Sequence, residues 1–530
     1  MNGAEHSPSE KYLQAVLIVI LSAYFIVFCI INFFGFERFC TPDVYADTVI
    51  ARIMWEQKTI FPSGWVFGNQ YYVVATPVLA ALFYGITGSI NIAMALATTL
   101  MTLLILAAFA WMVRPFVDRT QLLFGLLCLV SGIICFNAAT AIEGQILYIL
   151  ASYYSCYVIT LFVVWGCYIR SLFKKEGKFY KPAFIIALVL AFGTGMQSLR
   201  QTAVMVIPLA AFELLRILFI SVRSHAIPAR KDWYAAQKVA VMCIANISGY
   251  ILMQYLDIPN VTVYGRVAPS AGFEFARNAV SGLCALRSIT GLKYAGSSAA
   301  GIFSIVFGAF MIGMVLWFQG NSVAKKKATG NGLLCYSLLG TLSILCVLII
   351  NLVLDISLRS IYLFVWYPLV AYCAAGAAGT RHAGLKNALI LFFCVLSLGN
   401  FYMSYLPCAM EALTQDKSLE KKIAAWVEDK GYKLIYGKWY VIGKVAPYTD
   451  GAVTAGSWLE EPYKVLGYIN PLNVYSGMDN TRAVYMLSAS ERKNALRLAA
   501  ERGAAMTEVA SFGNGEYVLY TSSIRLMHGR

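Results

Sequence analysis

The sequence predicts an all-α polytopic membrane domain of about 11 transmembrane helices, with interfacial helices in its first outer loop, followed by a small C-terminal α/β domain outside the membrane. Three observations support this fold class. The 530 residues are 59% hydrophobic and only 13% charged, whereas soluble domains are about 25% charged. Apolar runs of transmembrane length recur along the first 405 residues. The composition then changes to that of a soluble domain.

Membrane spans are expected wherever an apolar run reaches about 17–25 residues. Residues 71–87 are also apolar, but they are short and contain Pro77, which favours a helix at the membrane interface. The first long run is too long for the apolar region of a cleavable signal and lacks a small-residue cleavage site, so we expect it to be retained. The eleven expected spans fall near 12–34, 90–113, 121–138, 145–169, 182–197, 202–221, 236–256, 301–318, 332–354, 361–378 and 386–405.

Basic residues are distributed unequally between the two sides of these spans. With the N-terminus inside, the inner loops hold 18 Lys and Arg, and the outer loops before residue 408 hold 9. The positive-inside rule therefore predicts a cytoplasmic N-terminus and an extracytoplasmic C-terminal region. The net charge of +15 is explained by such loops meeting anionic lipid headgroups, and we expect no nucleic-acid partner. The compact loops favour a bacterial cell membrane.

A soluble domain is predicted after the last span. The final 123 residues hold 15 Lys and Arg and 13 Asp and Glu. Asp416 is expected to cap a helix, and Ser488-Ala-Ser-Glu491 has the pattern of a capping box. Short β-like runs surround these helices. We therefore divide the chain into a membrane domain, 1–405, and an extracytoplasmic α/β domain, 406–530.

Two carboxylates one helical turn apart follow the first span, in Thr41-Pro-Asp-Val-Tyr-Ala-Asp47. Asp43 is a candidate N-cap of a helix over residues 44–57, and Asp47 would lie on the same face. One interpretation is helix capping alone. The other is a carboxylate held at a helix start and facing an outer cavity. Acids beside span ends are functional candidates because charge near hydrocarbon is costly.

Three further charged residues are expected near the outer membrane surface. Glu143 lies in a very short turn between the third and fourth spans, and points either at protein or at a site. Arg200 and Arg359 lie at outer span ends, and an arginine fork suits phosphate. The alternatives are that these arginines reach lipid headgroups or that Arg359 pairs with Asp355. Arg266 lies in the outer loop 257–300, which is too long for a mere connector.

This layout resembles the GT-C superfamily of integral membrane glycosyltransferases, which includes protein O-mannosyltransferases and the bacterial lipid A aminoarabinose transferase. The resemblance covers most of residues 1–405. It rests on an acidic first outer loop, a second acid after the third span, a large loop after the seventh, and Arg359 before a late span containing Pro368. Ile60-Phe-Pro-Ser-Gly-Trp65 is similar to a Trp- and Pro-containing turn in that first loop.

The resemblance implies transfer of a sugar from a polyprenyl-phosphate-linked donor to an extracytoplasmic acceptor, which is a cell-envelope glycan, a lipid or a protein. It implies that a first-loop Asp is the general base. Val44 follows Asp43, where the family often has Glu, so Asp43 and Asp47 are both candidates for the base. Glu143 takes an accessory acidic role.

Charge development during such a transfer gives the arginines a role. One base attacking in line predicts inversion at the anomeric carbon. Arginines near the lipid phosphate would stabilise the leaving group, and Arg200, Arg359 and Arg266 are the candidates. A divalent cation held by the acids is an open alternative, because carboxylates are hard oxygen ligands. No dedicated metal site and no other cofactor are expected, since the chain has four His and lacks a CxxC pair.

Two other classes of protein fit part of the pattern. A polytopic transporter or a flippase for lipid-linked substrates would explain the spans and the charges at their ends. It explains less well a long outer first loop with paired acids and a folded outer tail, and no internal repeat is evident. A membrane protein that assembles with a partner through its tail is the third alternative.

Overall fold

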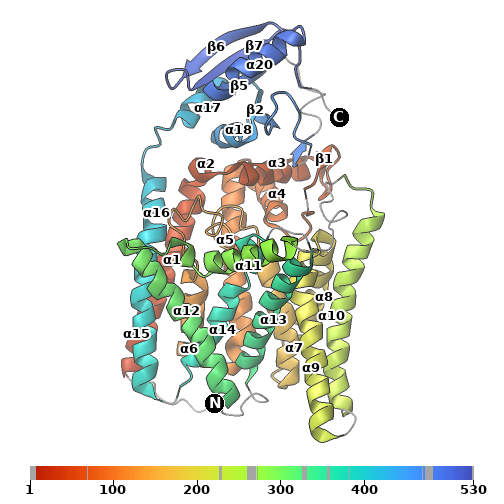
Figure 1. Cartoon of the computed structure of the whole chain (residues 1–530), viewed down its shortest axis with the longest axis vertical. Coiled ribbons are helices and arrows are strands. Elements are labelled where there is room, and N and C mark those ends of the chain that lie inside the picture. Colours follow the sequence, from red (N-terminus) through yellow and green to blue (C-terminus); the bar gives the residue numbers. More distant parts are fainter. Residues whose placement is uncertain are drawn as a thin grey trace.

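The computed structural model describes residues 8–527 except 69, 226–228, 260–269, 271, 272, 325–330, 355–357, 381, 468 and 472–481. The described chain forms a bundle of long helices with a small mixed sheet at one end (Figure 1). The first helix, α1, starts at the end of the bundle farthest from that sheet. This arrangement agrees with an odd number of membrane crossings.

Among the described residues, ten helical segments are long and apolar enough to cross a membrane. This result confirms a multi-pass all-α domain. Each overlaps one of the predicted apolar runs. The segments comprise α1 (Pro8–Phe34), α5 (Ile90–Val113), α7 (Ser155–Leu172), α8 (Tyr180–Gln197), α9 (Ile207–Ser224) with the π-helical turn Thr202–Val206 before it, α10 (Arg230–Tyr255), α12 (Ala299–Ala324), α13 (Gly332–Val353), α14 (Trp366–Ala377) with the 3-10 turn Ser360–Leu363 before it, and α15 (Ala383–Asn400), which continues as helix to residue 413.

The bounds predicted for the third and fourth spans are wrong. Helix α6 (Arg119–Ser131) has 13 residues, so it rises only about 20 Å in a hydrocarbon layer of about 30 Å. Residues 132–154 continue as irregular, mostly buried turns, and helix resumes only at Ser155. Tight packing explains the irregularity, because a Cβ on Gly144 would lie 1.8 Å from the Ala138 carbonyl oxygen. Glu143 therefore lies in a long buried loop and not in a short turn.

The first outer loop contains the interfacial helices that the sequence predicts. They are α2 (Phe36–Phe39), α3 (Pro42–Gln57) and α4 (Thr76–Thr87), with a short strand, β1 (Trp65–Val66), between the last two. Helix α4 has 12 residues, too few to span a membrane. Helix α11 (Phe273–Ile289) also lies across the bundle in Figure 1, farther from the sheet than α2, α3 and α4. Together these elements cover the end of the bundle nearest the sheet.

The C-terminal region is α/β, as predicted. Its helices are α16 (Leu406–Leu413), α17 (Leu419–Asp429), α18 (Trp439–Val445) and α20 (Ala489–Glu501). Its strands are β2 (Leu434–Lys438), β3 (Thr454–Trp458), β5 (Ala483–Ser488), β6 (Met506–Phe512) and β7 (Tyr517–Ser522), and a two-residue strand, β4 (Asn470–Pro471), pairs with β1. The five-stranded order is β3-β2-β5-β7-β6, with β2 parallel to β3 and β5, and β7 antiparallel to β5 and β6.

Helix caps in this region agree with the sequence in one case and differ in the other. Ser488 and Glu491 form the predicted capping box of α20. The cap of α17 is Ser418, whose side chain accepts from the Lys421 amide, and not Asp416. Asp416 instead accepts a hydrogen bond of 2.8 Å from the Ser418 amide. The acid therefore orients the residue that caps the helix.

Helices α8 and α10 approach each other through glycines. A Cβ on Gly195 would lie 2.0 Å from the Asn246 carbonyl oxygen, and a Cβ on Gly249 would lie 2.1 Å from the Phe192 carbonyl oxygen. Small residues at such contacts let backbones pack closely in a membrane. The Asn246 side chain adds a hydrogen bond of 2.8 Å to the Ala191 carbonyl.

We predict that Gly195→Ala lowers the apparent melting temperature of the detergent-purified protein. The added methyl group meets backbone that has no room to move, and overpacking of this kind costs about 1–3 kcal/mol. Gly313→Ala on α12 is the matched control, because nothing lies within 4 Å of a Cβ there. Equal melting temperatures for the two variants would contradict the described packing.

Candidate functional site

The start of helix α3 organises the site. Thr41 is its N-cap and accepts a hydrogen bond of 3.3 Å from the Val44 amide, and Pro42 follows in the first turn. The prediction that Asp43 is the N-cap is therefore wrong. Threonine already satisfies the amide that an aspartate cap would have bonded. The Asp43 carboxylate is thus not used to cap its own helix.

Asp43 is solvent-exposed, yet protein atoms surround it closely. Burial raises the pKa of its carboxyl above the ordinary value, and the charge of Arg359 opposes this rise. Asp43 is therefore a carboxylate at the protein surface that is partly desolvated by its neighbours and lies within the electrostatic reach of Arg359. The geometry brings together two residues that lie more than 300 positions apart in the sequence.

Asp47, one turn further along α3, has a different environment. It is 2% exposed, and its Oδ1 atom has no hydrogen-bond partner. Burial raises the pKa of Asp47 to about 8, while a hydrogen bond from Tyr72 lowers it and the nearby charge of Asp43 raises it. Tyr153 also faces both acids. Asp47 is consequently protonated for the most part at neutral pH.

Arg359 and Arg200 lie on either side of one short turn. Arg359 is exposed and immediately precedes the 3-10 turn Ser360–Leu363. Tyr362, in that turn, has its ring centroid 5.1 Å from the Arg200 guanidinium carbon. Arg200 also donates hydrogen bonds of 3.0 Å to the Gln70 side-chain oxygen and 3.4 Å to the Tyr154 hydroxyl. The two predicted phosphate-binding arginines therefore belong to one neighbourhood.

Glu143 supports the same turn from below the surface. It is 5% exposed, and its Oε1 atom lies 2.6 Å from the Lys293 Nζ atom. The same oxygen accepts hydrogen bonds of 3.2 Å from Ser288 and 3.3 Å from Ser360, the residue after Arg359. Burial alone would raise the pKa of Glu143, but the hydrogen bond and charge of Lys293 hold it below its ordinary value. The ionised Glu143 thus stabilises the turn that follows Arg359.

Two of the expected features have no described counterpart. Arg266, and Asp355 as the alternative partner of Arg359, both lie outside the residues that the structure describes. Within the described ranges, no group of three or more His, Cys, Asp or Glu side chains comes together to hold a metal ion. Of the three acids considered as cation ligands, Glu143 is paired with Lys293.

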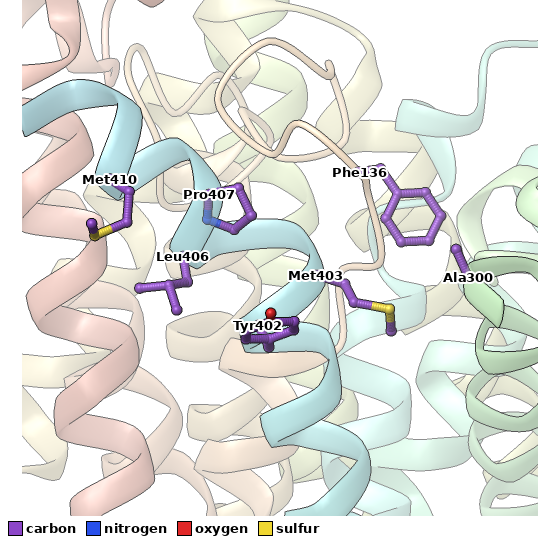
Figure 2. A pocket seen from close by; sticks show the side chains of 7 residues that line it. All are labelled: Phe136, Ala300, Tyr402, Met403, Leu406, Pro407 and Met410. Carbon is purple, nitrogen blue, oxygen red and sulfur yellow. The ribbon is translucent and has the colours of Figure 1, made fainter. Parts of the chain in front are cut away.

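Apolar pockets border helix α12. One, of about 450 Å³, is shown in Figure 2 and is lined by Phe136, Ala300 and five residues of the segment 402–410. The rings of Phe136 and Tyr294 meet edge to face with their centroids 4.6 Å apart, and Tyr294 is the neighbour of Lys293. A second, of about 390 Å³, is lined by residues of α11, α12 and α14, including Trp366. Neither pocket is lined by an acid, so both lie beside the charged site and not in it.

Several residues of the site are not evident from the sequence. Tyr72, Tyr153 and Tyr154 come from two tyrosine pairs in the outer loops, whereas Gln70 and Lys293 carry no distinguishing pattern. Tyrosines just outside apolar runs are ordinarily interfacial anchors. No charged residue adjoins either pair in the sequence, and Tyr153 and Tyr154 fall inside the predicted fourth span. Only the folded chain brings those loops together.

Comparisons with known proteins were made by sequence and by structure. No protein-family model matches the sequence, and no curated protein matches it. The structure is similar to the crystal structure of ArnT from Cupriavidus metallidurans bound to undecaprenyl phosphate, with a TM-score of 0.55 at 11% identity, over 98% of this chain and 99% of that one.

Two further structures are similar at lower scores. One is the Archaeoglobus fulgidus oligosaccharyltransferase in complex with Zn and sulfate, with a TM-score of 0.49 and 11% identity over 94% of this chain and 73% of that one. The other is the arabinofuranosyltransferase AftD from Mycobacteria, with a TM-score of 0.42 and 11% identity over 97% and 42%. The likeness to ArnT covers both chains almost completely, and the protein therefore has the GT-C fold of integral membrane glycosyltransferases.

Proposed function

We propose that this protein transfers a sugar from a polyprenyl-phosphate-linked donor to an acceptor on the extracytoplasmic side of a bacterial cell membrane. One observation carries the proposal: Asp43, exposed at the start of α3, lies close enough to the exposed Arg359 for the charge of the arginine to lower its pKa. A base for the acceptor and a cation for the departing phosphate are the two groups that such a transfer needs. The similar ArnT structure, which is bound to undecaprenyl phosphate, supports this class of donor.

The transfer step in this proposal is a single displacement. The acceptor oxygen attacks the anomeric carbon and forms the new glycosidic bond, while its proton passes to the Asp43 carboxylate. The bond between the anomeric carbon and the phosphate oxygen breaks, and its electron pair leaves on the polyprenyl phosphate. Attack from the face opposite the leaving group inverts the anomeric configuration. The negative charge that develops on the phosphate is stabilised by Arg359 and Arg200.

Asp43 is assigned as the base and Asp47 as its helper. A base must hold its carboxylate ionised and within reach of the acceptor, and Asp43 is exposed beside a cation. Asp47 is buried, and its pKa of about 8 keeps it mostly protonated at neutral pH. A neutral Asp47 adds no second negative charge to the site. Its hydrogen bond with Tyr72 instead orients the wall of the site behind Asp43.

The remaining charged residues position the phosphate site. Glu143 accepts from Ser360, so its ion pair with Lys293 steadies the turn that carries Arg359. Gln70 and Tyr154 hold Arg200 in a fixed orientation. Arginines oriented before the substrate arrives stabilise a leaving phosphate without reorganisation at the moment of transfer. Arg266 is assigned to the same phosphate through the family resemblance alone.

The donor's apolar tail is assigned to the surface of α12. The two pockets that border this helix are lined mainly by apolar side chains, as an isoprenoid chain requires, and the second also contains Arg287 and Thr290. In this proposal residues 1–405 form the catalytic membrane unit, with a cytoplasmic N-terminus. Residues 406–530 form an extracytoplasmic unit, on the side where a cell-envelope glycan, lipid or protein acceptor is found.

We predict that Asp43→Asn lowers the transfer rate by about 10²–10⁴-fold, the usual contribution of a general base. The protein is reconstituted in vesicles with a panel of undecaprenyl-phosphate-linked pentoses and hexoses and with native membrane lipid extract, and released undecaprenyl phosphate is measured. Glu56→Gln is the matched control, because this acid lies on the same helix and its side chain is 54% exposed.

Two outcomes would contradict this function. Full activity of Asp43→Asn would remove Asp43 from the reaction. Movement of an intact lipid-linked sugar across the vesicle membrane, without release of undecaprenyl phosphate, would instead identify a flippase. Loss of activity in the Glu56→Gln control as well would mean that the helix, and not the carboxylate, is sensitive.

We predict that Asp47→Asn is more stable than the natural protein at pH 8, and that the difference shrinks towards pH 4. An unfolded aspartate ionises near pH 3.9, whereas buried Asp47 keeps its proton up to about pH 8. Between these values the folded state binds more protons, so stability falls as pH rises, by at most about 1.4 kcal/mol per pH unit. Asparagine does not titrate. Apparent melting temperatures from pH 4 to 8 test this, and a difference that does not vary with pH would contradict it.

A further inference from the structure

The C-terminal region is bonded directly to the helix that carries Asp43 and Asp47. Tyr45 lies between these two acids on α3 and is 5% exposed. Its hydroxyl accepts a hydrogen bond of 3.0 Å from the Ala455 amide in strand β3, 410 positions away in the sequence. Burial raises the pKa of Tyr45 to about 12, so this hydroxyl stays neutral. The bond therefore ties the middle of the acidic segment to the backbone of the sheet.

A second contact lies at the first residue of the same helix. Gly443 in α18 packs so closely on Pro42 that a Cβ there would lie 2.8 Å from the Pro42 Cα atom. The neighbouring position is Asp43 itself. Any side chain at position 443 must therefore displace either α18 or the start of α3. Glycine at this point sets how closely the C-terminal region approaches the acid.

Further bonds continue this interface along α2 and α3, two of the helices of the first outer loop. Arg52, on α3, donates to the Gly451 carbonyl at 2.5 Å and to the Thr454 hydroxyl at 3.3 Å. Arg38, in α2, forms an ion pair of 2.8 Å with Glu411. Strand β1 pairs with β4, so the loop after α3 is also joined to the C-terminal region. The C-terminal region thus contacts and stabilises helices α2 and α3.

The start of α5 is held in the same way. The Asn91 amide donates at 2.9 Å to the Asp450 carboxylate, and the Asn91 side chain donates at 2.9 Å to the Pro447 carbonyl. Asp450 and Pro447 belong to the segment that joins α18 to β3. The segment between α18 and β3 therefore forms hydrogen bonds with both α3 and the membrane-spanning helix α5. Movement of that segment would move α3 relative to the bundle.

We propose that the C-terminal region positions the catalytic aspartate through two of its residues: Ala455, whose amide donates to Tyr45, and Gly443, which packs on Pro42. This inference rests on the proposed role of Asp43 as the base. The membrane bundle supplies Arg359, and the C-terminal region sets where Asp43 stands opposite it. Tyr45 and Gly443 touch neither reacting atoms nor substrate, so they are positioning residues.

The proposal has a consequence for the pH dependence of transfer. The charged and titratable groups that the described structure sets against Asp43 are Arg359, Asp47, Tyr72 and Tyr153. Burial raises the pKa of Asp43 within this enclosure. If α3 loses its support, Asp43 becomes better hydrated and its pKa falls. The acidic limb of the rate profile then moves to lower pH while the maximal rate decreases.

The test compares Tyr45→Phe and Gly443→Ala with two controls in the full-length protein. Tyr440→Phe is the control for the lost hydroxyl, because Tyr440 is 60% exposed on α18. Lys444→Ala is the control for the altered helix, because Lys444 is exposed beside Gly443. Release of undecaprenyl phosphate is measured from pH 4 to 9 with whichever panel donor the natural protein uses.

We expect each test variant to lower kcat by about ten- to a hundredfold, as misplacement by about 1 Å does, with little change in the KM for the donor. We also expect the acidic limb to move to lower pH, and both controls to behave as the natural protein. A lower plateau with an unmoved acidic limb would mean a purely structural role and would overturn the proposal, as would unchanged kcat. Asp43→Asn is run in parallel: full activity there would end the proposed function instead.

Discussion

The candidate site depends on one electrostatic relation, the opposite charges of Asp43 and Arg359 at the end of the helix bundle nearest the sheet. Enclosing a carboxylate beside a membrane is costly unless a cation compensates for the lost water. The two residues come from the first outer loop and from the turn before α14, so the loops between them must fold around both. Glu143 and Lys293 secure the arginine side of this relation from within. Tyr45 and Gly443 connect the aspartate side to the C-terminal region.

The two acids of α3 have different proposed roles because their side chains differ in solvent exposure, although both are aspartates. Asp43 lies at the first turn, where its side chain is exposed. Asp47 lies one turn deeper and is 2% exposed, with a pKa of about 8. A pair of ionised carboxylates so close together would repel, and protonation of one removes that cost. The arrangement leaves a single negative charge near the arginine, which suits the general-base role proposed for Asp43.

Much of this architecture is accessible from the sequence, because membrane spans are read from apolar run length alone. The interfacial helices, the α/β C-terminal region and the capping box at Ser488 follow from local patterns. The loop 132–154 does not, because its backbone is buried by tertiary contacts that an apolar run resembles. The same holds for the site. Asp43, Arg200 and Arg359 stand out as charges at span ends, whereas Lys293 beside Glu143, and Ala455 beside Tyr45, are partners that only folding creates.

The most direct test of the central claim is an experimental structure of the reconstituted protein with undecaprenyl phosphate. The account predicts density for the phosphate within hydrogen-bonding distance of Arg359 and Arg200, beside the Asp43 carboxylate, with the isoprenoid chain descending along α12. Phosphate bound at the opposite end of the bundle, or remote from both arginines, would contradict it. So would a Glu143 carboxylate that leaves Lys293 to approach the ligand, because the structure assigns Glu143 to the support of the Arg359 turn.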